Sequence, residues 1–116
     1  MRYTVSMATR PKTEVLLERR RHEIKQKSGG GILSYEVWGI GEKGKTQVTR
    51  YNLAYINPML CAVDHGRVLG YDNAHGYHHR HHMGQVEPVE HTSFEETAEQ
   101  FQREVMALLK AHKEVK

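Results

Sequence analysis

Apolar and polar residues alternate along two consecutive stretches in the first half of the chain. Residues 32–40 and residues 46–56 are both rich in aromatic and β-branched side chains, which favour strands. Alternation predicts that one face of each strand is buried. The apolar positions on that face are Leu33, Tyr35 and Val37 in the first stretch, and Tyr51, Leu53 and Tyr55 in the second. The glycines and lysines of residues 41–45 predict a hairpin loop between the two strands.

Shorter apolar runs predict the rest of a sheet. Residues 13–23 begin with apolar residues, and we predict a strand there, although their Leu, Glu and Arg residues also favour helix. Residues 59–63 predict a short edge strand. Residues 67–71 predict a strand that ends near Asp72, after a tight turn at residues 64–66. Four or five strands in succession, with short connections, predict an antiparallel meander.

An amphipathic helix is predicted near the end of the chain. Ser93 and Glu96 have capping-box spacing, and apolar residues then recur at helical spacing as one stripe. The stripe consists of Phe94, Ala98, Phe101, Val105 and Leu108. We therefore expect an α+β fold, in which an antiparallel β-meander of four or five strands has a C-terminal α-helix packed on one face. Residues 13–116 would form this single domain, and residues 1–12 a flexible N-terminal arm.

Length and hydropathy fit one small domain. The 116 residues have a mean hydropathy of −0.71, and no apolar run approaches the roughly 20 residues of a membrane-spanning helix. The first residues lack the apolar centre of a signal peptide. Cys61 is the single cysteine and cannot form an internal disulfide. We therefore expect a cytoplasmic protein, in which Cys61 is a small buried side chain rather than a nucleophile.

Positive charge is concentrated in the first half of the chain. Residues 1–50 carry 11 Lys and Arg against 5 Asp and Glu, whereas residues 51–116 carry 6 against 9. A basic half favours an acidic partner such as nucleic acid, although the same charges would also solvate a surface. Arg19 and Arg21 would share one face of a strand, so they are candidate nucleic-acid contacts. The alternative is a charged edge strand that discourages association.

Five histidines are crowded into residues 75–82, at the centre of a stretch that we expect to be a loop. One chemistry that this composition favours is the cleavage of RNA. That reaction needs a base for the 2′-hydroxyl proton, an acid for the leaving oxygen and a cation for the phosphate. Histidine titrates near neutral pH, so a pair of histidines can serve as base and acid.

Five residues are the candidates for this catalytic site. His79 and His81 would transfer protons, and Arg80 would bind the phosphate and also count as a nucleic-acid contact. Asp72 would orient one imidazole. Asn73 would donate to an oxyanion or stabilise a turn. This interpretation requires no cofactor.

A metal site is the second interpretation of the same residues. His79 and His81 alternate, so an extended segment would place both on one side and Arg80 on the other. With Asp72 they could bind zinc or a redox-active divalent ion. The spacing matches neither a zinc ribbon nor an HExxH helix. In a third, structural interpretation, one or two imidazoles hold the loop through hydrogen bonds to backbone.

The histidine-rich stretch also carries a family resemblance. The run GYDNAHGYHHRHHMG at residues 70–84, followed by VEPVE at residues 86–90 and a helix opening, resembles the TumE-type family. The resemblance covers about residues 32–109. It implies the toxin of a prokaryotic toxin–antitoxin pair, with a cognate antitoxin that contains a DNA-binding domain. Ala74 and Met83 stand where we expect charged residues in many relatives.

The residues and the resemblance together predict a toxin that acts as a ribonuclease, with RNA as its substrate. The alternative is a non-enzymatic protein that binds nucleic acid or metal and helps its partner to regulate transcription. Turnover of RNA by metal-free protein would separate the two. A homo-oligomer is compatible with either function, and no membrane association is expected.

Overall fold

The two predicted long strands form the middle of the structure. β2 (Ile32–Glu42) and β3 (Lys45–Ile56) are neighbouring antiparallel strands. Their apolar residues face the same side of the sheet, where Leu53 and Tyr55 are fully buried. The computed structural model describes residues 14–42 and 44–114, and the predicted arm, residues 1–12, lies outside them.

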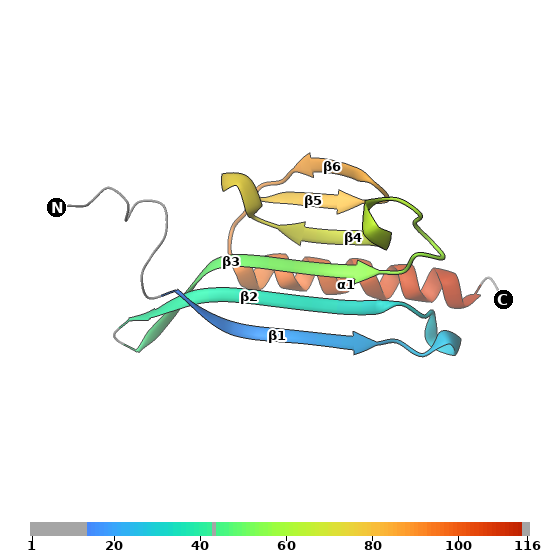
Figure 1. Ribbon diagram of the computed structural model, residues 1–116, viewed down its shortest axis with the longest axis horizontal. Coiled ribbons are helices and arrows are strands. Elements are labelled where there is room, and N and C mark those ends of the chain that lie inside the picture. The colour runs from blue at the N-terminus through green and yellow to red at the C-terminus, as the bar shows by residue number, and fades with distance from the viewer. Residues whose placement is uncertain (1–13, 43, 115–116) are drawn as a thin grey trace.

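All strands belong to one antiparallel sheet and lie in it in the order of the chain (Figure 1). Besides β2 and β3, they are β1 (Val15–Glu23), β4 (Arg67–Asp72), β5 (His79–His82) and β6 (Gln85–Pro88). The prediction of a strand rather than a helix at the beginning is therefore confirmed. The meander is also confirmed, but its six strands exceed the four or five predicted.

Of the two additional strands, β5 lies in the histidine-rich stretch, which we predicted to be a loop, and β6 follows directly after it. The loop is limited to residues 73–78, because the chain re-enters the sheet at His79. Met83 and Gly84 form a two-residue turn between β5 and β6, and their φ angles are 50° and 87°. Positive φ at both central residues is what a tight hairpin turn with the twist of a sheet requires. His79, His81 and His82 therefore lie on a strand of this hairpin, whereas His75 and His78 lie in the loop.

The predicted edge strand at residues 59–63 is wrong. Asn57 turns the chain there, since its Oδ1 accepts a hydrogen bond from the Met59 N–H at 3.1 Å. The Asn57 carbonyl also accepts hydrogen bonds from the N–H groups of Leu60 and Cys61. A strand would need these N–H groups for a neighbouring strand. Cys61 is a free, buried thiol, as predicted.

Helix α1 (Phe94–Glu114) packs against one face of the sheet (Figure 1). Ser93 Oγ accepts a hydrogen bond from the backbone N–H three residues on, at 3.1 Å, which confirms the predicted cap. Phe101 is fully buried, and its ring meets those of Tyr35 and Tyr71 edge to face. Within the described ranges, no helix has the length and apolar character that crossing a membrane needs.

The opposite face of the sheet carries no α-helix in residues 14–42 and 44–114. We refer to it as the open face. A row of polar residues that are neighbours in register crosses it, one from each of the first five strands: Arg19 on β1, Glu36 on β2, Asn52 on β3, Asp72 on β4 and His79 on β5. The open face is therefore polar, and it holds the candidate site.

Candidate functional site

The pairing of β4 with β5 brings three of the predicted site residues together. Asp72 lies opposite His79, and Gly70 lies opposite His81. Because side chains alternate along a strand, His79 and His81 both project from the open face, beside Asp72. All three side chains are buried. We refer to Asp72, His79 and His81 as the triad.

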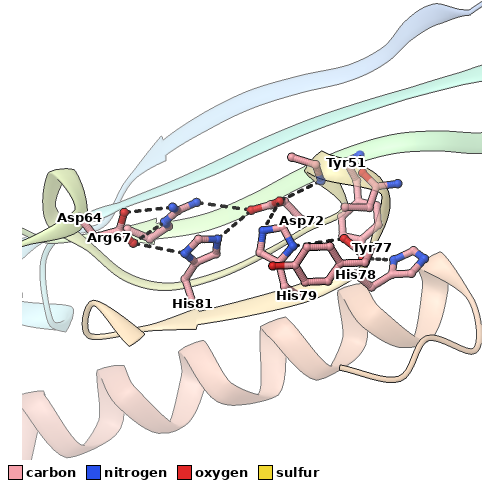
Figure 2. A network of polar contacts seen from close by, with 10 residues as sticks. Tyr51, Asp64, Arg67, Asp72, Tyr77, His78, His79 and His81 are labelled. Atoms are coloured by element: carbon pink, nitrogen blue, oxygen red, sulfur yellow. Dashed lines mark hydrogen bonds and ion pairs between the residues drawn. The ribbon is translucent and has the colours of Figure 1, made fainter. Parts of the chain in front are cut away.

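One carboxylate contacts both imidazoles of the triad (Figure 2). Asp72 Oδ1 lies 2.8 Å from His79 Nε2, and Asp72 Oδ2 lies 3.1 Å from His81 Nε2. Asp72 Oδ1 also accepts a hydrogen bond from the Ala74 N–H at 3.0 Å, which fixes the carboxylate. Asp72 is therefore placed to orient two imidazoles, where the sequence indicated one.

The second nitrogen of each imidazole also faces an oxygen atom. His79 Nδ1 lies 3.2 Å from the carbonyl oxygen of Tyr77, and His81 Nδ1 lies 3.5 Å from Asp64 Oδ2. The second contact is an ion-pair distance without hydrogen-bond geometry, so His81 Nδ1 has no hydrogen-bond partner among the described residues. A neutral imidazole carries one N–H and can donate to only one acceptor.

A guanidinium–carboxylate pair lies directly beside the triad. Asp64, in the turn η3 (Asp64–Gly66), accepts hydrogen bonds from Arg67 Nε at 2.9 Å and from Nη2 at 3.1 Å. Arg67 Nη1 is 3.6 Å from Asp72 Oδ2. Gly70 makes this approach possible, since a Cβ atom at that position would lie 2.7 Å from Arg67 Cδ.

Burial and neighbouring charges determine the protonation of these groups. Burial lowers the pKa of His81 and the Arg67 guanidinium lowers it further, whereas the carboxylates of Asp72 and Asp64 raise it. Hydrogen bonds from Arg67 hold the pKa of Asp64 below its ordinary value. Near pH 7 the His81 ring is therefore mainly uncharged, and Asp64 is ionised.

A groove crosses the open face above the triad. It has a volume of about 510 Å³ and is lined by all three triad residues together with side chains of β2, β3 and the loop 73–78. Tyr77, which is 46% exposed, and Trp38 contribute aromatic rings to its wall. The Arg50 guanidinium lies 4.6 Å from the centre of the Trp38 ring. A cavity of about 310 Å³ adjoins the groove and shares Arg67 with it.

The two arginines predicted on β1 lie on the open face with the triad. Arg19 is opposite Glu36 in register, and its Nη2 atom forms an ion pair with the Glu36 carboxylate at 2.7 Å. Arg21 is two residues farther along the exposed strand and projects from the same face. Arg20 points to the other face, where its guanidinium lies over the Tyr35 ring at 4.9 Å.

Asn73 and Arg80 are not brought to the triad in the predicted way. Asn73 lines the groove, but its amide accepts a hydrogen bond from the Tyr51 N–H and donates one to the Thr49 carbonyl. These contacts support the turn role that the sequence left open. Arg80 projects from the helix-covered face, where its guanidinium pairs with Glu104 at 3.3 Å. The sheet separates it from the triad.

Asp64 and Arg67 belong to the site, but the sequence analysis did not single them out. Asp64 looked like part of a tight turn, and Arg67 looked like the first residue of a strand. The only local signal is their spacing of three residues with opposite charge. Their nearness to the histidines depends on strand register and on Gly70, which no local pattern records.

A family model described as Toxin TumE matches residues 9–109, a range that contains the triad, the groove and most of α1. The chain belongs to the TumE toxin family. This confirms the resemblance seen in the sequence, and membership of a toxin family implies a cognate antitoxin as partner. No curated protein and no solved structure matches the chain significantly.

The triad of this TumE-family toxin has the donor set of a metal site. One ligand atom from each of its residues lies within 4.8 Å of the other two. Two imidazoles and a carboxylate suit zinc and neighbouring transition metals. Two ligands of a tetrahedral zinc ion with bonds of about 2.1 Å lie roughly 3.4 Å apart. The separations of Asp72 from the two imidazoles, 2.8 and 3.1 Å, are shorter than this, so the side chains would move slightly apart around an ion.

A second pair of histidines in the TumE-family chain has a structural role near the start of α1. The rings of His78 and His91 stack 3.7 Å apart. The Tyr51 hydroxyl lies 2.7 Å from His78 Nδ1, and Thr97 Oγ1 lies 3.1 Å from His91 Nδ1. Burial lowers the pKa of His78 and raises that of Tyr51 to about 12. These contacts join the loop 73–78 to β3 and to the helix.

Proposed function

We propose that this toxin is a ribonuclease whose reaction centre is the triad of Asp72, His79 and His81. The observation that carries the proposal is the register of β4 and β5, which gathers the three buried side chains beneath a groove on the open face. Burying polar groups costs stability unless they are well paired. Clusters of this kind are common where chemistry takes place.

The reaction would be cleavage of a phosphodiester by the neighbouring 2′-oxygen of RNA. The 2′-hydroxyl loses its proton as its oxygen forms a bond to phosphorus. The bond from phosphorus to the 5′-oxygen breaks, and that oxygen takes up a proton. The products are a 2′,3′-cyclic phosphate and a 5′-hydroxyl. The site must serve two proton transfers and stabilise charge on the phosphate oxygens.

Arg67 takes the place of Arg80 as the phosphate-binding cation in this proposal. Its guanidinium is 3.6 Å from the Asp72 carboxylate, and its side chain is 20% exposed. Asp64 binds it through two hydrogen bonds, the fork-shaped arrangement that a phosphate also adopts with arginine. A phosphate of RNA would replace Asp64 as the partner of Arg67, next to the triad.

Other side chains of the open face support a path for single-stranded RNA. Arg19 and Arg21 on β1 lie on the same face as the triad and would contact phosphates of the RNA on one side of the cleaved bond. Tyr77 and Trp38 line the groove itself. Aromatic rings of this kind stack with unpaired bases without reading their sequence.

Cleavage of RNA by the purified protein tests the reaction centre. His79→Ala and His81→Ala should each lower the rate about 100- to 10,000-fold. His82→Ala is the matched control and should retain the rate, since His82 lies on the same strand but projects from the helix-covered face. Growth should slow when the wild-type toxin is expressed without its antitoxin. His82→Ala should slow growth as much as the wild type does, and His79→Ala and His81→Ala should slow it less.

Arg67→Lys and Arg80→Lys make a second matched comparison. Lysine keeps the charge but loses the planar fork of donors. Only Arg67→Lys should therefore slow the cleavage of RNA, because Arg80 lies on the other face. Melting curves would separate lost chemistry from lost folding. Folded His79→Ala and His81→Ala proteins with full activity would refute the reaction centre and favour a non-enzymatic binding protein.

A further inference from the structure

Each imidazole of the triad lies between two oxygen acceptors. Asp72 faces the Nε2 atoms of both rings. The Tyr77 carbonyl faces Nδ1 of His79, and the Asp64 carboxylate faces Nδ1 of His81. An imidazole in its neutral form has one N–H group, and its other nitrogen then sets a lone pair against one of these oxygen atoms. One positive charge, the Arg67 guanidinium, lies 3.6 Å from Asp72 Oδ2, and a second positive charge between the two rings and the carboxylate would satisfy the lone pairs that face these oxygens.

A metal ion between the two Nε2 atoms and the carboxylate would supply that charge. With the N–H at Nδ1, the His79 ring donates to the Tyr77 carbonyl, and His81 Nδ1 faces Asp64 Oδ2 at 3.5 Å. Both rings then direct an Nε2 lone pair toward Asp72. We propose that the triad binds one divalent transition-metal ion of the zinc class through His79 Nε2, His81 Nε2 and an oxygen of Asp72. The proposal that the triad binds a metal ion is based on these contacts. A role of the ion in cleavage depends on the proposed ribonuclease function.

The groups around the triad match those that surround metal ligands in proteins. A histidine that binds a metal usually donates its other N–H to a backbone carbonyl or a carboxylate, which fixes the ring. Here Tyr77 provides a carbonyl for His79, and Asp64 provides a carboxylate for His81. Asp72 is itself held by the Ala74 N–H at 3.0 Å. Imidazole ligands favour zinc and its neighbours over magnesium and calcium, which prefer oxygen.

Three protein ligands leave coordination positions open, as in catalytic rather than structural zinc sites. The triad lines the groove of about 510 Å³, so an open position is accessible to a phosphate oxygen. A bound ion would polarise that oxygen as a Lewis acid. Because it would occupy the Nε2 lone pairs of both imidazoles, binding of the ion, rather than proton transfer by the rings, would then account for the dependence of cleavage on His79 and His81. Arg67, beside Asp72, would bind another oxygen of the same phosphate.

Calorimetry with zinc chloride, on full-length protein freed of metal by a chelator, tests the site. We expect one equivalent to bind. His79→Ala and His81→Ala should weaken binding by more than about 100-fold, whereas Asp64→Asn, which keeps all three ligands, should weaken it about 10- to 100-fold. His82→Ala should leave binding unchanged. Cobalt(II) should give the visible absorption of a four-coordinate ion, and this absorption should be lost in His81→Ala.

Absence of zinc binding would overturn the proposal, as would weak binding of several ions that His81→Ala leaves unaltered. If a ligand variant does not fold, the stoichiometry of zinc binding by the wild type and the weaker binding expected of Asp64→Asn still test the proposed site. Failure of the ribonuclease proposal gives a different result, namely tight zinc binding with no RNA cleavage in the presence of zinc. Full cleavage by protein that binds no zinc would refute the metal site alone.

Discussion

Gly70→Ala is a direct test of how the fold places Arg67. A Cβ atom at residue 70 would lie 2.7 Å from Arg67 Cδ and 3.2 Å from the Leu53 carbonyl oxygen. Carbon atoms in contact are normally about 3.5–4.0 Å apart, so the Arg67 side chain has to move by about 1 Å. Its hydrogen bonds to Asp64, at 2.9 and 3.1 Å, would then be broken.

The expected cost follows from two opposing contributions. Hydrogen bonds between charged groups stabilise a protein by about 1.5–3 kcal/mol, and this pair is partly buried, with side chains 20% and 21% exposed. Replacing glycine with alanine restricts the unfolded chain and returns about 0.4–1 kcal/mol. We therefore expect Gly70→Ala to lower the free energy of unfolding by about 0.5–2.5 kcal/mol.

Urea denaturation of Gly70→Ala and Gly41→Ala measures this difference. Gly41 is also in a strand, but a Cβ atom there meets nothing nearer than the Lys45 carbonyl oxygen at 3.9 Å. Gly41→Ala should therefore lose no stability. RNA cleavage should slow in Gly70→Ala alone, because the phosphate-binding guanidinium is displaced. Equal stability and equal cleavage rates in the two variants would show that Gly70 does not place Arg67.

Two further predictions concern stability. Phe101→Ala should lower the free energy of unfolding by about 3–5 kcal/mol, because the ring is fully buried. Met106→Ala, on the exposed side of the same helix, should lower it little. A loss below about 1 kcal/mol for Phe101→Ala would contradict the packing. Asp64, with its lowered pKa, stabilises the fold above about pH 4 and loses this effect as pH falls through its folded pKa. Asp64→Asn should therefore lose less stability than wild type between pH 5 and pH 3 in urea denaturation.

The spacing of apolar residues was sufficient to predict the elements that follow one regular pattern, either helical spacing or strand alternation. The stripe around Phe101 and the cap at Ser93 predicted α1, and alternation predicted β2 and β3. The same approach failed at residues 59–63, where five residues of mainly apolar type resembled a strand. Asn57 turns that segment, because its Oδ1 and its backbone carbonyl accept hydrogen bonds from the N–H groups of residues 59–61, and such local competition is not visible in hydropathy.

The candidate site was predictable only where alternation along one strand was enough. Alternation placed His79 and His81 on one side and Arg80 on the other, as the structure shows. The cation beside the triad is nevertheless Arg67, eight residues before His75 in a strand that seemed to serve only as a scaffold. Its position depends on the register between β4 and β5 and on the space above Gly70, which are long-range features.

The β4–β5 hairpin also determines where this chain can gain or lose residues. The loop 73–78 lies outside the strand pairing, so a change in its length can leave Asp72 opposite His79. The turn at Met83 and Gly84 has only the two residues that a tight hairpin requires. A one-residue insertion within β5 would move the side chains that follow it to the opposite face of the sheet. Evolutionary drift in length is therefore expected between Asp72 and His79, whereas the interval from His79 to His81 should stay fixed.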